Sequence, residues 1–281
     1  MKQAGFSLVE VTVALAIGLL VVGAVLATYL SSSQAQRMQG ATAQMDEDAQ
    51  IALRLLSSEL MQAGYSAPTG MSESDPASFV RAAVPSPLLE CGSGPSASAG
   101  PCASRPTNQT GAVALLVSYE ATRNNTALAD NSASDCLGSS LGSVRIVTNR
   151  YFLSSASGLT SLQCLGSALS ATGAPIASAP LVSNIESLKF WYGQASAVGI
   201  AAQPVRHVTA DELDGDATTA FASVVSVRIC VLARSSEPVL GLDANVLSSY
   251  LDCDLKSQVS ADRRLRRAYF TTVTLRNLRP I

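Results

Sequence analysis

Histidine is nearly absent from this sequence of 281 residues, since His207 is the only one. Catalysis of the Ser-His or Cys-His type would depend on that single side chain, which lies in a loop-like segment before a strand-like run. The cysteines form no CxxC pair and no cluster with histidine, so the spacings typical of zinc sites are missing. A glycine-rich phosphate loop and a series of stacking aromatic residues are missing too. The sequence therefore predicts no enzyme, no cofactor and no metal site.

Charge is also scarce. Charged residues make up 14% of the chain and sum to a formal net charge of −2, whereas hydrophobic residues make up 47%. This net charge does not indicate nucleic acid or an acidic membrane surface as a partner. The apolar content is that of a folded chain, and the length allows one sizeable domain with an accessory element, or two small domains.

Six cysteines are spread along a chain rich in Ser, Thr, Gly and Ala, a composition typical of secreted β-rich domains. They are Cys91, Cys102, Cys136, Cys164, Cys230 and Cys253. We expect disulfides, formed in an oxidising compartment. Spacing alone does not fix their connectivity. We favour pairing of sequence neighbours (Cys91 with Cys102, Cys136 with Cys164, Cys230 with Cys253), and the alternative is a different connectivity or a reduced pair.

One long apolar run extends from Phe6 to Leu30, which is enough to cross a bilayer as a single helix. A secretory signal peptide would carry its cleavage site after a shorter apolar run. Here a short polar leader, residues 1–5, stands before the run instead. The sequence therefore predicts a membrane-spanning helix over residues 6–30.

A single carboxylate interrupts this run. Glu10 lies where an unneutralised charge costs about 3 kcal/mol. Cleavage after Gly5 would create a positive amino terminus at Phe6, and we expect Glu10 of one subunit to pair with that terminus of a neighbour. The alternative is that Glu10 extends to the lipid headgroups from the end of the helix.

The segment Gly5-Phe6-Ser7-Leu8-Val9-Glu10 resembles the prepilin peptidase signature of type IV pilins and of type II secretion pseudopilins. The resemblance implies that prepilin peptidase cleaves after Gly5 and that Phe6 is then N-methylated. It also implies that Glu10 sets the register of the subunit as it enters a filament.

Beyond Tyr29 the chain turns polar, yet no proline occurs before Tyr65, and apolar residues recur at spacings of three and four. They are Met38, Met45, Ala49, Ala52, Leu53, Leu56, Leu60 and Ala63. We predict one helix over Phe6–Tyr65 that ends at Gly64, and its second half, residues 31–65, lays an apolar stripe on a sheet. The acidic run Asp46–Asp48 is expected on its solvated face.

The remaining residues, 66–281, are predicted to form a β-rich globular domain. The expected strands are Ala112–Tyr119, Val144–Leu153, Leu159–Leu165, Ile185–Tyr192, Val224–Ala233 and Ala268–Asn277. The segment from Pro68 to Pro106 is rich in Pro, Gly and Ser and is expected to be irregular, with room for one short helix or strand. The predicted fold class is α+β and pilin-like: a long N-terminal helix, apolar then amphipathic, packed on a mostly antiparallel β-sheet with disulfide-stapled loops.

Fragments along the whole chain, taken in order, are similar to the PilW type of minor pilin. They are Ser58–Tyr65, Asp135–Gly138, Val147–Phe152, Leu162–Cys164, Leu181–Gly193, Val225–Leu232 and Thr274–Asn277. Two features depart from the family pattern. Phe221 stands where a tryptophan is expected, and a Ser/Gly/Pro-rich insert surrounds Cys91 and Cys102.

This resemblance implies a minor pilin that helps to initiate type IV pilus assembly in a priming or tip complex. Its partners would be other minor pilins, the major pilin and a large tip adhesin. It would cross the inner membrane once, with its C-terminal domain in the periplasm, and then lie at the pilus tip. The alternatives are a J-type minor pseudopilin of a type II secretion system, and a tip pilin that binds DNA or a surface; nucleic acid is the less favoured partner.

Two charged clusters remain. Asp211, Glu212, Asp214 and Asp216 lack the full spacing of a calcium loop, so we favour a solvated acidic turn. Arg263, Arg264, Arg266 and Arg267 form a basic run before the last strand. We favour an exposed basic turn over a binding site for an acidic pilin or for DNA.

Overall fold

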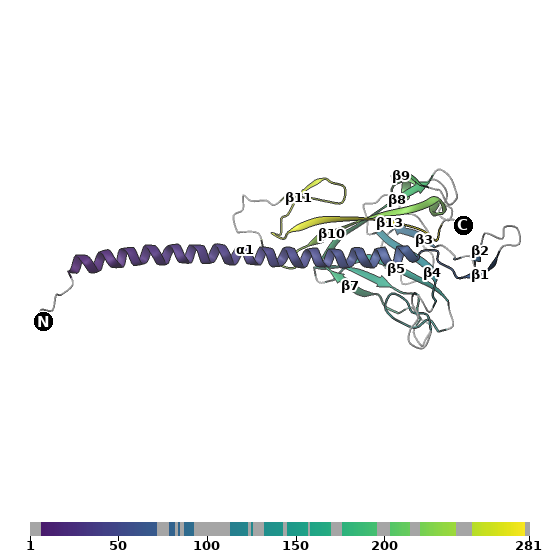
Figure 1. Ribbon diagram of the computed structural model, residues 1–281, viewed down its shortest axis with the longest axis horizontal. Helices are drawn as coiled ribbons and strands as arrows, with labels where there is room; N and C mark the ends of the chain where they lie inside the picture. The colour runs from purple at the N-terminus through teal and green to yellow at the C-terminus, as the bar shows by residue number, and fades with distance from the viewer. Residues whose placement is uncertain are drawn as a thin grey trace.

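The computed structural model describes residues 7–71, 79–81, 84, 87–92, 113–122, 125, 132–142, 145–156, 158–169, 176–195, 203–213, 220–239 and 249–278. The molecule is a long rod with a head at one end (Figure 1). The rod is a single helix, and the head contains two main β-sheets that both contact the second half of that helix.

The rod is helix α1 (Leu8–Gln62), which has 55 residues and lies within the predicted span. It continues through Gly40 because most of the residues on either side of it, in QAQRMQ before and ATAQM after, have high helix propensity. It ends as predicted before Gly64, whose φ of 72° is left-handed. The N–H of Gly64 donates to the carbonyl of Ser118 at 2.9 Å, so the chain turns directly from the helix onto a sheet.

One sheet has five strands, and every neighbouring pair is antiparallel. In spatial order they are β3 (Leu88–Gly92), β4 (Val113–Glu120), β5 (Ile146–Ala156), β6 (Leu159–Leu165) and β7 (Ala179–Ser183). Every position of β4 is buried, which places this strand at the centre of the head.

The second sheet has four antiparallel strands. In spatial order they are β13 (Arg266–Thr274), β10 (Val224–Arg234), β8 (Ile185–Ala195) and β9 (Pro204–Val208). Strands β10 and β13 contact α1 from this sheet, and β4 and β7 contact it from the other.

The smaller elements lie around these two sheets. They are the hairpins β1 (Pro68–Met71) with β2 (Phe79–Arg81) and β11 (Ser249–Leu251) with β12 (Ser257–Val259), and the 3-10 turns η1 (Ala210–Glu212) and η2 (Ala220–Ser223). The β11–β12 hairpin lies at the end of the head from which the free part of α1 emerges (Figure 1).

A continuous core joins α1 to both sheets. The largest fully buried side chains are Tyr119, Tyr151, Tyr192, Phe152 and Phe190. Tyr192 packs edge-on against Phe221 with ring centroids 5.0 Å apart, so the residue that departs from the family pattern still supplies an aromatic ring to the core.

The α+β class and all six predicted strands are present, but two expectations need correction. The strands divide between two sheets instead of one, and the segment expected to be irregular contains β1, β2 and β3. The strands that the sequence pattern missed are short and mostly at edges. Several begin with or contain proline, as β7 and β9 do, and edge strands tolerate proline because one side of their backbone makes no ladder bonds.

Candidate assembly site

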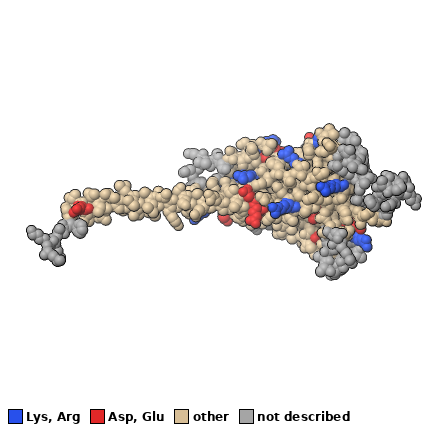
Figure 2. Space-filling view, viewed as in Figure 1, with Lys and Arg blue, Asp and Glu red and all other residues tan. Residues whose placement is uncertain are grey.

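The free half of α1 is the most unusual surface of the molecule. Its most apolar stretch is long and hydrophobic enough to span a membrane, and none of it is buried by the rest of the chain. Large aliphatic side chains point outward all round it, as Leu8, Leu15 and Leu20 do at 80%, 62% and 74% exposure. Figure 2 shows this rod free of charge except for an acidic group near its outer end. Such a surface requires lipid or other apolar helices around it.

Glu10 is that acidic group. It occupies the third position of the helix, where the backbone N–H of Ser7 donates to its carboxylate at 3.4 Å. Glu10 therefore helps to cap its own helix in the isolated chain, and its side chain remains exposed. The predicted cleavage junction, Gly5 and Phe6, lies outside the described residues, so the pairing of Glu10 with an amino terminus stays a prediction.

The second half of α1 is fixed to the head by both apolar and polar contacts. The buried stripe comprises Met45, Ala49, Ala52, Leu56 and Leu60, all of which were predicted to face a sheet. The acidic run beside it is only partly solvated, which corrects the sequence-based expectation. Glu47 is exposed, but Asp46 accepts hydrogen bonds from the Tyr269 hydroxyl and from Arg267, and Asp48 accepts one from Asn184 at 3.3 Å.

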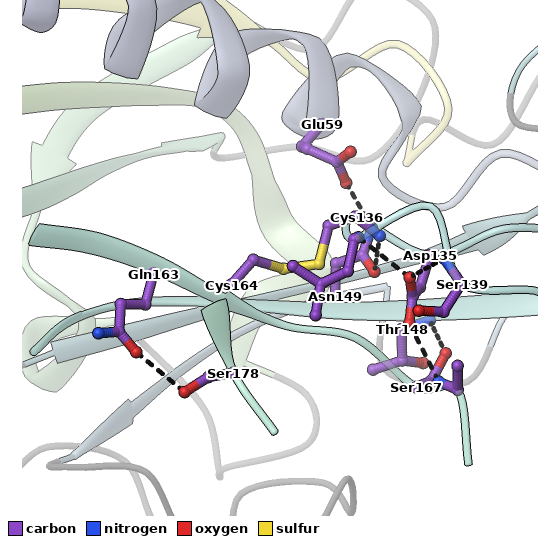
Figure 3. Close-up of a disulfide and its surroundings, with 12 residues drawn as sticks. Glu59, Asp135, Cys136, Ser139, Thr148, Asn149, Gln163, Cys164, Ser167 and Ser178 are labelled. Atoms are coloured by element: carbon purple, nitrogen blue, oxygen red, sulfur yellow. Dashed lines mark hydrogen bonds between the residues drawn. A yellow bond between two sulfur atoms is a disulfide. The ribbon is translucent and has the colours of Figure 1, made fainter. Parts of the chain in front are cut away.

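A polar cluster lies where the end of α1 meets the five-stranded sheet (Figure 3). The fully buried Asn149 on β5 donates from Nδ2 to Glu59 on α1 at 3.0 Å and to the Tyr119 hydroxyl on β4 at 3.3 Å. Its Oδ1 accepts from the backbone N–H of Cys136 at 3.0 Å. We call Asn149, Glu59, Tyr119 and Cys136 the Asn149 cluster. One amide thus connects the helix, the sheet and a disulfide-bonded loop.

Burial dominates the electrostatics of this cluster. It raises the pKa of the Glu59 carboxyl, although hydrogen bonds from Asn149, Tyr151 and Tyr119 act in the opposite direction. Burial and the neighbouring Glu59 also raise the pKa of the Tyr119 and Tyr151 hydroxyls, so both remain neutral donors. The cluster therefore holds one carboxyl group among neutral hydrogen-bond donors.

The loop next to this cluster is held by Asp135 and by the disulfide between Cys136 and Cys164 (Figure 3). One Asp135 oxygen accepts from the N–H groups of Leu137 and Ser139 at 3.0 and 2.9 Å, and the other accepts from Ala168 at 3.2 Å. This buried carboxylate thus shapes its own turn and ties it to the residues after β6.

A second disulfide joins Cys230 on β10 to Cys253. It holds the β11–β12 hairpin against the outer face of the four-stranded sheet, where Tyr250 and Phe270 pack around it. Both described disulfides link the cysteines that neighbour pairing predicts. Cys91 is also disulfide-bonded, and its predicted partner, Cys102, lies outside the described residues.

The basic run is only in part the exposed turn that the sequence predicts, because Arg263 and Arg267 are exposed whereas Arg264 and Arg266 are partly buried. Arg266 forms ion pairs with Glu186 at 2.6 Å and with Asp262, and Arg234 joins the same Glu186 at 3.1 Å. Hydrogen bonds from Arg266 hold the pKa of Asp262 well below its usual range. Arg264 donates to the carbonyls of Ser235 and Ser236. These cations are therefore occupied within the chain and are poorly available to a polyanion.

The remaining candidates for chemistry do not converge on a reactive site. His207 is exposed on β9, with Nε2 3.4 Å from the Ser226 hydroxyl. Asp211 and Glu212 cap η1 through Thr209, while Asp214 and Asp216 lie outside the described residues. Within the described part of the chain, no group of three or more His, Cys, Asp or Glu residues could hold a metal ion.

Sequence reasoning missed the structural role of Asn149, Asp135 and Glu186. All three belong to fragments that resemble the PilW type, so the resemblance marked their positions without giving the reason for them. The partners of Glu186 could not be predicted from the sequence, because these arginines are 48 and 80 residues away along the chain.

No curated protein matches the chain significantly. A type IV-like pilin from Thermus thermophilus, TTHA1219, is similar in structure with 12% sequence identity and a TM-score of 0.37, over 83% of this chain and 96% of that one.

Two family models match the sequence. The model of the prokaryotic N-terminal methylation motif covers residues 1–26, and that of the type IV pilus-assembly protein W covers residues 150–277. The first match contains Glu10 and the first part of α1, as far as residue 26, and the second begins one residue after Asn149. Over these two segments the chain is similar to type IV pilins of the PilW family.

Proposed function

We propose that this chain is a minor pilin that helps to initiate type IV pilus assembly. In this proposal prepilin peptidase cleaves after Gly5, Phe6 is N-methylated, and the mature chain joins other minor pilins in a priming complex that stays at the pilus tip. Before assembly, α1 crosses the inner membrane and the head lies in the periplasm. Other pilins, the major pilin and a tip adhesin are the partners.

The observation that carries the proposal is the division of α1 into two halves. The first half is exposed, apolar and interrupted only by Glu10, and the second half is fixed to the head. Inside a bilayer, apolar helices gain little from contact with each other over contact with lipid. An ion pair between Glu10 and the amino terminus of a neighbouring subunit supplies a specific attraction there. Once subunits leave the bilayer, their apolar halves must pack together to stay out of water.

Processing is tested by substitution at Gly5. In Gly5→Ala the peptidase should act slowly or not at all, so the chain should keep its leader in the membrane fraction. Intact mass of the amino-terminal peptide measures both cleavage and methylation. A product of normal mass from Gly5→Ala would contradict the assignment of the junction.

Assembly is tested at Glu10. Glu10→Ala should insert into the membrane like the wild type, but its share in sheared pili should fall at least tenfold, since a loss of about 1.4 kcal/mol already has that effect. Glu10→Asp keeps the charge and serves as the control, with an intermediate loss. Wild-type incorporation of Glu10→Ala would refute the pairing role.

Initiation is tested by deleting the gene and counting pili. Loss of pili, restored by the wild-type chain and not by Glu10→Ala, is the expected result. Normal pilus number together with a defect in protein secretion would instead favour the pseudopilin alternative.

A further inference from the structure

One residue stands out on the four-stranded sheet. Strand β10 has eleven residues, and all of them are buried except Arg228. Arg228 lies at the centre of the sheet, opposite Trp191 on β8 and Thr272 on β13. Its side chain is on the outer face, because its neighbours Val227 and Ile229 belong to the core beneath.

Two aromatic rings flank this guanidinium. Its carbon lies 5.6 Å from the Trp191 ring centroid and 4.9 Å from that of Phe270, and the two ring centroids are 6.4 Å apart. Stacking on aromatic rings holds a guanidinium in place while its N–H groups stay available at the edge. We call Trp191, Arg228 and Phe270 the arginine–aromatic surface.

Arg228 differs from three other cations of this face, each of which has a carboxylate partner. Arg234 and Arg266 pair with Glu186, and Lys189, which lies 5.3 Å from the Trp191 ring centroid, pairs with Asp254. Among the residues that the structure describes, none forms an ion pair with Arg228. The described part of the chain thus holds Arg228 in an exposed and fixed position without neutralising its charge.

The surroundings favour a protein partner over a nucleic acid. The β11–β12 hairpin, which the Cys230–Cys253 disulfide fixes to the same outer face, exposes Leu251, Leu255 and Val259 at 53%, 61% and 54%. A nucleic acid needs several phosphate contacts, whereas this face offers one unpaired guanidinium beside aliphatic side chains.

We propose that the arginine–aromatic surface docks another pilin subunit by receiving an exposed Asp or Glu carboxylate from it. Arg228 donates two parallel N–H bonds to the carboxylate, and Trp191, Phe270 and the hairpin aliphatic residues cover the apolar surroundings of that group. This inference rests on the proposed function, since it takes the partner from the pilin complex.

The test uses the full-length chain in its own cells. A photo-crosslinking amino acid at Thr272, the exposed neighbour of Arg228, should link the chain to another pilin, and peptide mass spectrometry should place the link near an Asp or Glu. Arg228→Glu and Arg228→Gln should each lower the yield at least tenfold, and Arg228→Lys should lower it less. Arg145→Gln, on a side chain 81% exposed beside the other sheet, is the matched control for Arg228→Gln and should crosslink like the wild type.

The decisive step is a charge exchange: changing the identified carboxylate to Arg should restore crosslinking to Arg228→Glu. An unchanged yield in Arg228→Glu, a link far from any carboxylate, or failure of the exchange would overturn the proposal. Binding of a short DNA duplex that depends on Arg228 would overturn it as well. If wild-type chains enter pili but substitution of Arg228 does not change the crosslinking yield, only this inference fails. If wild-type chains never enter pili, the proposed function fails.

Discussion

Replacing Asn149 by alanine removes three hydrogen bonds from a site that solvent does not reach. The Glu59 carboxyl group loses its hydrogen bond from Asn149 but keeps those from Tyr119 and Tyr151. The backbone N–H of Cys136 loses its acceptor in a partly buried place. At about 1 kcal/mol for each lost bond, we expect Asn149→Ala to lower the free energy of unfolding by about 3 kcal/mol.

The assay is thermal unfolding of the full-length chain in detergent micelles, followed by the emission of Trp191, which is the only tryptophan. For a head of this size, a loss of about 3 kcal/mol should lower Tm by about 6 to 12 °C. Asn277→Ala is the matched control, because the Asn277 side chain also bonds the helix, through the carbonyl of Met61 at 2.9 Å, but at the surface. It should lower the stability by less than about 1 kcal/mol.

Asn149→Asp sharpens the test. It keeps the size of the side chain but places a second carboxyl group against Glu59, whose pKa burial already raises. The loss in free energy of unfolding should be larger for Asn149→Asp than for Asn149→Ala. It should grow as the pH rises, because both carboxyl groups then ionise. Equal Tm values for Asn149→Ala and Asn277→Ala would refute the view that this amide fixes the helix to the sheet.

Three further predictions concern other contacts of the head. Burial raises the pKa of Glu90 to about 7, although the Tyr192 hydroxyl donates to its carboxyl group at 2.6 Å. Folding therefore favours the protonated form, so the free energy of unfolding should fall by roughly 3 kcal/mol as the pH rises from about 4.5 to about 7. Urea titrations at several pH values should show this fall in the wild type and not in Glu90→Gln. Replacing Cys230 and Cys253 together by serine should cost about 3 kcal/mol, because the bond closes a separation of 23 residues; an unchanged urea midpoint would contradict this. Glu186→Ala leaves two mostly buried guanidinium groups without their shared carboxylate, and we expect a loss of about 2 kcal/mol that Glu186→Asp partly restores.

The helix and the central strands could be predicted because each depends on a local pattern. The intervals between Met45, Ala49 and Ala52 indicate one buried helix face, and the alternation around Val227 and Ile229 indicates a strand. Strands β7 and β9 escaped prediction because an edge strand needs only one partner and tolerates proline, so its sequence carries little signal.

The charged contacts escaped for a different reason. A run such as Arg263–Arg267 gives the number of charges but not their partners, since Glu186 and Asp46 reach it only through the fold. Asp46–Asp48 was expected in solvent because three consecutive acidic residues on an exposed helix usually remain there. Whether an ion pair forms is decided by tertiary distances, which neither composition nor periodicity contains.

The apolar stripe and these charged contacts together fix the position of α1. A slide of one turn, about 5.4 Å, would bring Leu56 to the place of the fully buried Ala52, or Ala52 to the place of Leu56, so one buried site would be overpacked or another left empty. The same slide would separate Asp46 from Tyr269, Asp48 from Asn184 and Glu59 from Asn149 at once. The loss of these three polar contacts, at about 1 kcal/mol each, adds to the cost of the mismatched stripe. The head therefore holds a single register on the helix, and the height of the arginine–aromatic surface above Glu10 is fixed in every subunit.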